Sequence, residues 1–277
     1  MTEVASGGSS RHDSHIHLFE HGFRSDTEAG QELATYEGLR AEHGIGRAVV
    51  VGFEGNPAHV GNNAYITRLA ADHDWIVPLA FVDLAAVTAT PTLARQLRDA
   101  GAAGWSAYVQ QPGAGAAWAE LPDQVWDDLD GGSVLSLNID PGELAALTPR
   151  LASLQHTTVL LSHLGLPARG PGSSVEERLA PVVAAARAVP RLLVKSSGEY
   201  ATAGPDEQAP FPSAKPYLQH LRYQLGAERL VWGSDYVPML QRQTFASQVD
   251  LASYGVFDEA ELRLVEGENL ARVLPHG

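Results

Sequence analysis

Short apolar runs alternate with amphipathic segments along most of the chain. Each run is bounded by glycine, proline or polar residues, and most are too continuously apolar for a sheet that has one face in water. The runs predict eight β-strands, at residues 13–18, 47–53, 76–82, 102–109, 133–139, 157–163, 191–198 and 229–235. We therefore expect most of these strands to be buried on both faces.

The segments between the predicted strands carry helical periodicity. The pattern is found at residues 32–44, 62–74, 90–101, 140–155 and 175–189. The first segment ends in Gly44, the second begins with Asn62 and the third with Thr90, residue types that are common at helix ends. Eight strands alternating with helices predict a single-domain (β/α)8 barrel of the TIM type. The alternative is a doubly wound open sheet, but no glycine-rich phosphate-binding fingerprint follows the first strand.

Composition narrows the possible chemistry. The chain has 277 residues and no cysteine, which excludes disulfides, a thiolate nucleophile and any zinc site built on sulfur. A metal would therefore need His, Asp or Glu ligands. With 19 basic and 33 acidic residues the formal net charge is −14, and no Lys/Arg run is long enough for a phosphate-binding stripe. We expect no nucleic-acid partner.

The two ends of the chain differ in character. Residues 1–10 are small and polar and lack the basic and apolar regions of a signal peptide, so we expect a flexible segment there and the barrel at 11–277. No segment approaches 18 continuous apolar residues, which predicts a cytoplasmic protein with no membrane partner. The sequence leaves a homo-oligomer open. Several prolines lie in and next to residues 202–215, and this segment predicts a long loop that could act as a lid.

Polar residues close three of the predicted strands. His15 and His17 end the first strand and, two positions apart, share a face; His163 ends the sixth strand and Asp235 the eighth. Because the active site of such a barrel lies at the C-terminal ends of its strands, we expect these four side chains to converge. They could hold a divalent ion with room for water, and the ion would lower the pKa of that water.

Other residues near strand ends are candidates for the same site. Lys195 inside an apolar barrel would be costly unless it met a carboxylate or an anionic substrate, so it either polarises a substrate carbonyl or pairs with an acid. Candidate substrate contacts are Ser106, Tyr108, Asn138, Ser197, Glu199, Tyr200 and Tyr236. For the aromatic residues among them, and for Trp105 and Trp232, the alternative is packing in the core. For Glu199 and Tyr200 the alternative is a solvated pair in a loop.

Three further polar residues have predicted structural roles. His12 points away from the other histidines on an extended strand, toward the helices or the barrel floor. Asp13 shares the face of His15 one layer deeper, and we expect its carboxylate to orient a histidine. Asn269 is expected to tie the C-terminal helix.

Five motifs together resemble a known family. They are "DSHIHLF" near the start, "LSHLGLP" at 161–167, "VKSSG" at 194–198, "VWGSDYVP" at 231–238 and "GENLARVL" at 267–274. In this order, over nearly the whole chain, they resemble the amidohydrolase-related proteins of the amidohydrolase superfamily. The branch that is most similar includes 2-pyrone-4,6-dicarboxylate lactonase, sugar-acid lactonases and the aminocarboxymuconate-semialdehyde decarboxylase type.

The resemblance implies roles for the matching residues. His15 and His17 match the first-strand pair of the family, His163 its "DHxG" histidine and Asp235 its "GSDxP" aspartate. Asp235 would then act as general base or proton shuttle, while the histidines hold the substrate carbonyl or a divalent metal, zinc or manganese. Some lactonases of this branch work without a metal, so both kinds of site stay open.

The sequence also departs from the family pattern. Ser162 stands where the family commonly has Asp, and Ser106 stands where a Gly-x-Arg arginine would clamp an anionic substrate. Asn138 is neutral where a charged group could have stood. These departures weigh against a dicarboxylate substrate and favour a neutral or singly charged ligand.

We expect an enzyme that hydrolyses a small cyclic ester, a lactonase, with Asp235 as the base. The alternative reaction is non-oxidative decarboxylation of an aromatic or unsaturated acid, in which Asp235 or a histidine protonates carbon. An isomerisation or ring closure also stays open. A barrel that binds a small molecule without catalysis is disfavoured, because all the expected strand-end His and Asp positions are occupied.

Overall fold

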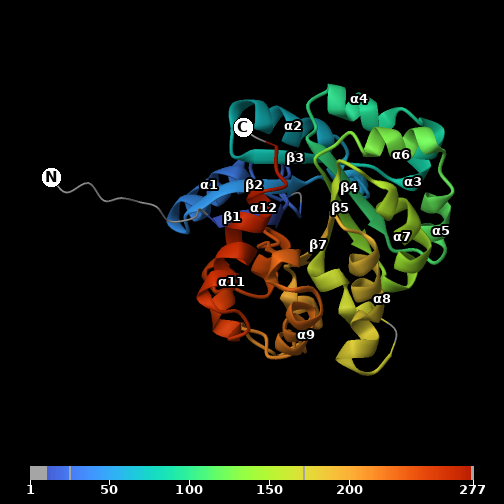
Figure 1. Cartoon of the computed structure of the whole chain (residues 1–277). Helices are drawn as coiled ribbons and strands as arrows, with labels where there is room; N and C mark the ends of the chain where they lie inside the picture. The colour runs from blue at the N-terminus through green and yellow to red at the C-terminus, as the bar shows by residue number, and fades with distance from the viewer. Residues whose placement is uncertain (1–10, 25, 171, 276–277) are drawn as a thin grey trace.

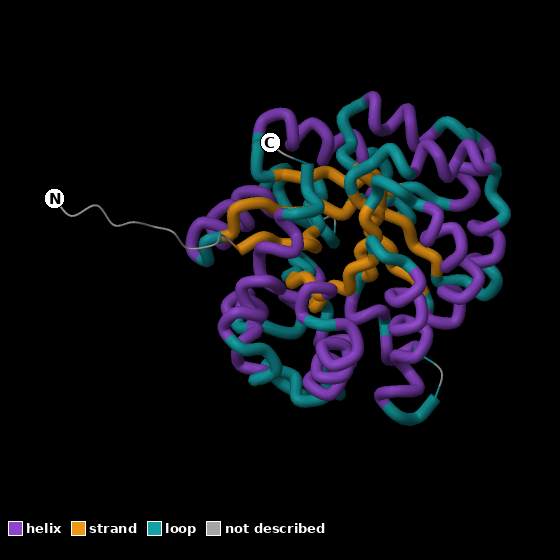
Figure 2. Tube along the Cα trace, viewed as in Figure 1, coloured by secondary structure: helices purple, strands orange, loops and turns teal. Residues whose placement is uncertain are grey.

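Eight parallel strands form a single sheet in the order β1 to β8. The computed structural model describes residues 11–24, 26–170 and 172–275, and its helices surround the strands in one domain (Figures 1 and 2). The strands are β1 Arg11–Ile16, β2 Ile45–Val51, β3 Ile76–Phe81, β4 Gly104–Val109, β5 Val134–Ile139, β6 Thr158–Leu161, β7 Leu192–Ser196 and β8 Leu230–Trp232. The predicted (β/α)8 barrel is confirmed. The segment predicted to be flexible, 1–10, lies outside the described residues.

Residues just beyond β8 close the barrel against β1. The amide of Asp235 donates to the carbonyl oxygen of His15 at 2.8 Å, and the amide of His17 donates to the carbonyl oxygen of Tyr236 at 2.5 Å. Ile16 and Tyr236 form the corresponding parallel bridge. A sheet whose first and last strands meet has no open edge, so the doubly wound alternative is wrong.

Twelve α-helices lie in the described residues. They are α1 Gln31–Glu42, α2 Asn62–Asp72, α3 Leu84–Ala89, α4 Leu93–Asp99, α5 Ala114–Ala119, α6 Asp123–Leu129, α7 Leu144–Ser153, α8 Val175–Ala188, α9 Lys215–Leu225, α10 Phe245–Val249, α11 Glu259–Arg263 and α12 Asn269–Ala271. Two helix ends differ from the capping residues predicted from the sequence. Gly61 in the left-handed region precedes α2, while the side chain of Asn62 donates to Leu18 O and accepts from Phe53 N. Thr90 ends α3 instead of starting α4.

The barrel interior changes from apolar to polar toward the C-terminal ends of the strands. On β7, Leu193 belongs to the inner apolar cluster and Lys195 follows on the same face. On β5, Val134 is followed in the same way by Ser136 and Asn138. The other face of each strand packs on the helices in a larger apolar layer. The fold therefore gathers buried polar groups at one end of the barrel.

Several predicted structural residues lie in the core. Trp105 and Trp232 are fully buried and donate to the carbonyl oxygens of Leu129 at 2.8 Å and Gln248 at 3.1 Å. Core packing is thus the correct interpretation of both. Asn269 ties α12 to the start of β8, since its amide donates to the carbonyl oxygens of Ala227 and Leu230, both at 2.8 Å.

The predicted loop at residues 202–215 is folded upon itself. Glu207 accepts hydrogen bonds from the amides of Gly204 at 3.2 Å and Ser213 at 2.7 Å, and also from the Ser213 hydroxyl. The loop contributes no side chain from 203–214 to the cavity described below, so the structure does not place it as a lid. No helix in the described residues is long and apolar enough to cross a membrane.

Candidate active site

A cavity of about 290 Å³ opens among the loops that follow the strands. Its walls come from the segments after β1, β2, β6, β7 and β8 and from the end of β4. The lining residues are His17, Phe19, Phe23, Phe53, Tyr108, His163, Tyr200, Asp235 and Pro238. Three of the four strand-end residues predicted from the sequence therefore line one cavity, and the fourth, His15, contacts one of them, His17.

The first-strand histidines contact each other. Nε2 of His15 lies 3.2 Å from Nε2 of His17, and Nδ1 of His17 lies 2.8 Å from the carbonyl oxygen of Val51. A carbonyl only accepts, so Nδ1 of His17 carries the ring hydrogen and its Nε2 faces the site with a lone pair. Burial lowers the pKa of His17 to about 4, which keeps the ring neutral at pH 7.

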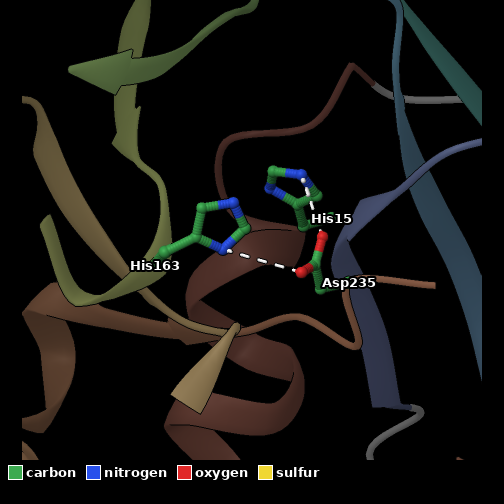
Figure 3. A group of neighbouring side chains, drawn as sticks. All are labelled: His15, His163 and Asp235. Atoms are coloured by element: carbon green, nitrogen blue, oxygen red, sulfur yellow. Dashed lines mark ion pairs between the residues drawn. The ribbon is translucent and has the colours of Figure 1, made fainter. Parts of the chain in front are cut away.

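Asp235 lies between the three histidines. Its Oδ1 is 3.6 Å from Nε2 of His15 and 4.0 Å from Nε2 of His17, and its Oδ2 is 4.0 Å from Nδ1 of His163. Figure 3 shows the side chains of His15, His163 and Asp235 directed toward one another. The hydroxyl of Tyr200 donates to Oδ2, and Oδ1 is the oxygen that faces the imidazoles of His15 and His17. Burial raises the pKa of Asp235 to about 6.

His163 is held in an unusual backbone conformation. It begins the 3-10 turn η3 (His163–Gly165) after β6, where His163, Leu164 and Leu166 have φ of 55°, 57° and 55°. Asp235 also has a positive φ, 58°. Such conformations cost free energy in non-glycine residues and are found at functional sites. Both residues are thus aimed by strained turns beyond the strands rather than by the strands themselves.

The ring of His163 packs against β7 and the turn that follows it. Its Nδ1 lies 3.2 Å from the hydroxyl of Ser197, which accepts from the amide of His163 and can therefore donate to the ring. A Cβ on Gly198, whose φ is 63°, would lie only 2.5 Å from that same Nδ1. Burial lowers the pKa of His163 to about 3, so this ring is also neutral.

Lys195 contacts His15 instead of the cavity. Its Nζ lies 3.1 Å from Nδ1 of His15 and donates to the hydroxyl of Ser136 at 2.6 Å, and the side chain is fully buried. Burial lowers the pKa of Lys195 to about 7, with the charges of Asp235 and Asp13 opposing the shift. The structure does not bring Lys195 to the substrate cavity, so any effect on the reaction passes through His15.

The predicted substrate contacts divide into two groups. Tyr108 and Tyr200 line the cavity, and Ser197 reaches it only through His163. The hydroxyl of Ser106 donates to Gly52 O at 2.8 Å, and Asn138 accepts from Gln110 at 2.6 Å. Neither Ser106 nor Asn138 lines the cavity.

Two residues after β7 and β8 are turned away from the cavity. Glu199 is buried, accepting from Ser196 at 2.6 Å and Gln248 at 3.1 Å, so it is not the solvated loop residue that the sequence offered as an alternative. The hydroxyl of Tyr236 donates to the carbonyl oxygen of Glu32 at 3.0 Å, within the layer between strands and helices. Both residues support the loops that carry Tyr200 and Asp235.

The prediction that the carboxylate of Asp13 orients a histidine ring is wrong. Its carboxylate accepts from the amides of His15 at 3.0 Å and Ser234 at 2.9 Å and from the hydroxyl of Tyr36 on α1 at 3.0 Å. Register shifts on either side of Asp13 interrupt the simple alternation of β1, so the carboxylate faces backbone amides and not a histidine ring. His12, as expected, is remote from the site and accepts from the amide of Arg47.

Three phenylalanines of the cavity were not predicted. Phe19 and Phe23 follow β1, and Phe53 follows β2. The ring of Phe19 stacks on His17 at 5.9 Å, and that of Phe53 lies 4.9 Å from Tyr108. The signal that could have found them is their position, since each comes within a few residues of a strand end.

The donor set suits a divalent cation. One ligand atom each from His15, His163 and Asp235 all lie within 4.8 Å of one another, and Nε2 of His17 is next to that of His15. Imidazole nitrogen and carboxylate oxygen are ligands that zinc and manganese accept. The Nδ1 of His17 has the carbonyl partner typical of a metal-bound histidine, whereas Nδ1 of His15 faces Lys195.

A family model described as amidohydrolase matches residues 12–275. The chain belongs to the amidohydrolase family. Membership of the amidohydrolase family supports an enzyme, and many members bind a divalent metal. A comparison with curated proteins found no match.

Solved structures share the fold of this amidohydrolase. An amidohydrolase from Burkholderia multivorans with bound zinc has a TM-score of 0.73 at 20% identity, over 96% of this chain and 100% of that chain. A probable 2-pyrone-4,6-dicarboxylic acid hydrolase from Acinetobacter baumannii with citric acid bound has a TM-score of 0.73 at 19% identity, over 95% and 98%. The 5-carboxyvanillate decarboxylase of Sphingomonas paucimobilis has a TM-score of 0.56 at 13% identity, over 96% and 99%.

Proposed function

We propose that this amidohydrolase is a lactonase that hydrolyses a small cyclic ester. The observation that carries the proposal is the placement of Asp235, a buried carboxylate at a cavity wall with one oxygen held by Tyr200 and the other facing neutral imidazoles. A carboxylate with a pKa of about 6 is ionised at neutral pH and can still accept a proton. The structural likeness to a pyrone hydrolase supports the same reaction class.

In the proposed reaction Asp235 takes a proton from water as that water attacks the lactone carbonyl. The ring C–O bond then breaks, and the proton held by Asp235 passes to the leaving oxygen, so that one water molecule is consumed per ring opened. We assign Ser197 as the donor to Nδ1 of His163, an assignment that places the hydrogen of this cavity-lining ring on Nε2. There it can donate to the oxyanion that develops on the carbonyl oxygen.

Four residues would hold a metal in this site. They are His15, His17, His163 and Asp235. A bound divalent cation would supply Lewis acidity and lower the pKa of its water. Binding through Nε2 of His15 requires the ring hydrogen on Nδ1, where a neutral Lys195 can accept it.

The walls of the cavity limit the substrate. Phenylalanine and tyrosine rings form most of the lining, which suits a flat, unsaturated ring. No lysine or arginine is among the described lining residues, so this cavity itself favours an uncharged ring. A volume of about 290 Å³ fits a single six-membered lactone with small substituents.

A panel of 2-pyrones and of saturated γ- and δ-lactones tests the proposal, with acid release followed in a weakly buffered pH-indicator assay. Asp235→Asn should reduce turnover at least about 10³-fold while the melting curve stays cooperative. Near-normal activity of Asp235→Asn would show that another group is the base. If a lactone binds tightly and none turns over, the barrel is a binding protein instead of an enzyme.

The aromatic lining also supports a second candidate, decarboxylation of an aromatic acid. The 5-carboxyvanillate decarboxylase shares the fold, and Asp235 protonated at its buried carboxyl could deliver a proton to carbon. Release of CO₂ without uptake of water, measured in a coupled bicarbonate assay, separates this reaction from lactone hydrolysis.

A further inference from the structure

One histidine that the proposed reaction does not use lies behind the aromatic lining of the active-site cavity. His59 ends the 3-10 turn η1 (Pro57–His59), which follows β2. The turn is fixed by Asn56, whose side chain accepts from the amide of Ala58 at 3.0 Å. Pro57, Ala58 and Val60 are exposed, whereas His59 is only 7% exposed. An exposed turn therefore directs one imidazole into the protein.

The ring of His59 packs against three phenylalanines, Phe19, Phe23 and Phe53, which we call the aromatic wall. Its centroid lies 4.0 Å from that of Phe19 and 6.2 Å from that of Phe23, and both pairs are stacked, with interplanar angles of 26° and 14°. The centroid of Phe53 is 6.1 Å away, and its ring is tilted by 59°. The three phenylalanines line the cavity and His59 does not. His59 thus supports from behind a wall whose members come from two loops.

The backbone of the aromatic wall is anchored independently of His59. The carboxylate of Glu32 accepts from the amide of Phe19 at 3.0 Å and from that of Phe23 at 2.6 Å. The amide of Phe53 donates to the side-chain oxygen of the first residue of α2 at 3.0 Å. A substitution of His59 therefore leaves these anchors in place and changes only what supports the phenylalanine side chains.

His59 supports the aromatic wall as an uncharged ring. Burial lowers the pKa of His59 below its ordinary value, so the imidazole is neutral at pH 7. Among the described residues none forms a hydrogen bond or an ion pair with its ring nitrogens. The ring borders a small cavity of about 90 Å³ between the segment after β1 and the start of α2. What His59 presents to the phenylalanines is therefore a flat aromatic face.

We propose that His59 is a positioning residue that holds the aromatic wall flat and so restricts the substrate to planar, unsaturated lactones. The inference rests on the proposed lactonase function and names the substrate class of its cavity. Aromatic rings contact one another in preferred geometries, and packed side chains pass a change on to their neighbours. Without the imidazole, the phenylalanine rings can turn into the space it leaves, which joins the 90 Å³ cavity. A puckered ring then fits where a flat one was required.

The experiment compares 6-methyl-2-pyrone with δ-hexanolactone, which has the same skeleton in saturated form. The quantity measured is the selectivity, the kcat/KM for the pyrone divided by that for the saturated lactone. His59→Ala should lower the selectivity at least about tenfold. The change should arise in KM, with kcat for the pyrone within about threefold of wild type, because His59 does not line the cavity that holds Asp235.

Three further variants make the comparison specific. His59→Phe keeps a flat ring and should retain the selectivity of the wild type. His59→Leu keeps apolar volume without a flat face, so it should lower the selectivity even if His59→Ala fails to fold. His220→Ala is the control, since His220 on α9 lines neither cavity. Equal losses on both lactones in His59→Ala and His59→Leu would show a structural role only and overturn the inference.

Binding of the same two compounds separates the aromatic wall from the reaction. Calorimetry compares Asp235→Asn with Asp235→Asn/His59→Ala. If the wild type hydrolyses neither compound, but the pyrone binds more tightly and His59→Ala removes that preference, the role of His59 stands and the lactonase assignment falls. If both compounds are hydrolysed and His59→Ala leaves the selectivity unchanged, the inference is overturned and the lactonase stands. Absence of both hydrolysis and binding overturns both.

Discussion

Nζ of Lys195 lies 3.1 Å from Nδ1 of His15 in the closed interior of the barrel. A charged Lys195 can only donate there, which places the ring hydrogen of His15 on Nε2, next to the unprotonated Nε2 of His17. A metal needs the opposite tautomer. The hydrogen bond between Lys195 and His15 therefore has opposite directions in the two sites: Lys195 donates in the metal-free site and accepts in the metal-bound site.

At pH 6, where Lys195 with its pKa of about 7 is mostly charged, Lys195→Met should raise the zinc affinity of the site about tenfold, because no ammonium then competes for Nδ1 of His15 or repels the cation. Competition with a chromophoric zinc chelator measures the affinity directly, without reference to activity. The matched control is Lys215→Met, which changes the other lysine of the chain, exposed on α9. Zinc affinity that is equal or lower in Lys195→Met would mean that this lysine does not set the tautomer.

Gly198→Ala should displace the ring of His163. The added Cβ would lie 2.5 Å from Nδ1, at a position whose φ of 63° already disfavours other residues. We expect turnover on the identified lactone to fall at least about tenfold and stability to fall by about 1 to 2 kcal/mol. Gly204→Ala is the control in the following loop, since nothing lies within 4 Å of its added Cβ. Equal effects of the two substitutions would contradict the role given to Gly198.

Asp235→Asn should stabilise the chelator-treated protein at pH 8 but not near pH 4. Burial raises the pKa of Asp235 from its usual 3.8 to about 6, so the folded state holds the proton more tightly than the unfolded state. The ionised carboxylate therefore costs stability above pH 6, and this cost disappears as the pH falls from 6 to 4. The shift corresponds to about 2 to 3 kcal/mol at pH 8.

Urea unfolding at the two pH values measures this difference. Asp206→Asn, at an exposed position, is the control and should show little change at either pH. A stabilising effect of Asp235→Asn that is equally large at both pH values would indicate that charge burial is not its cause.

Tyr200→Phe should lower kcat about 10- to 100-fold while the fold stays intact. The hydroxyl of Tyr200 holds Oδ2 of Asp235, and without it the carboxylate is free to turn Oδ1 away from the imidazoles. The same hydrogen bond lowers the pKa of Asp235, so the acid limb of the rate profile should move to higher pH. The control is Tyr223→Phe, because Tyr223 is 84% exposed. An unchanged pH profile would argue against this contact in solution.

The sequence predicted the barrel and the strand-end histidines and aspartate because both depend on local patterns. Buried parallel strands are continuous apolar runs, and a polar residue at the end of such a run falls at one end of the barrel whatever the loops do. His15, His17, His163 and Asp235 needed no knowledge of the turns to be grouped.

The rest of the site depends on contacts that no local pattern records. A register shift in β1 turned Asp13 toward amides, and left-handed turns at His163 and Asp235 set directions that non-glycine residues rarely adopt. The partner of Lys195 is His15, which is 180 positions away in the chain. Tyr236 faces α1 because the segment after β8 pairs with β1 at this position. These features arise only when distant segments meet.

The seam that closes the barrel joins Asp13 to Ser234, 221 positions further along the chain. Asp235 receives its backbone partner from His15 at the same seam. During synthesis the three histidines leave the ribosome long before the aspartate does, and contacts of such sequence separation form late in folding. A partly made chain thus has neither the base nor the wall that encloses it, and chemistry begins only when the two ends of the protein have met.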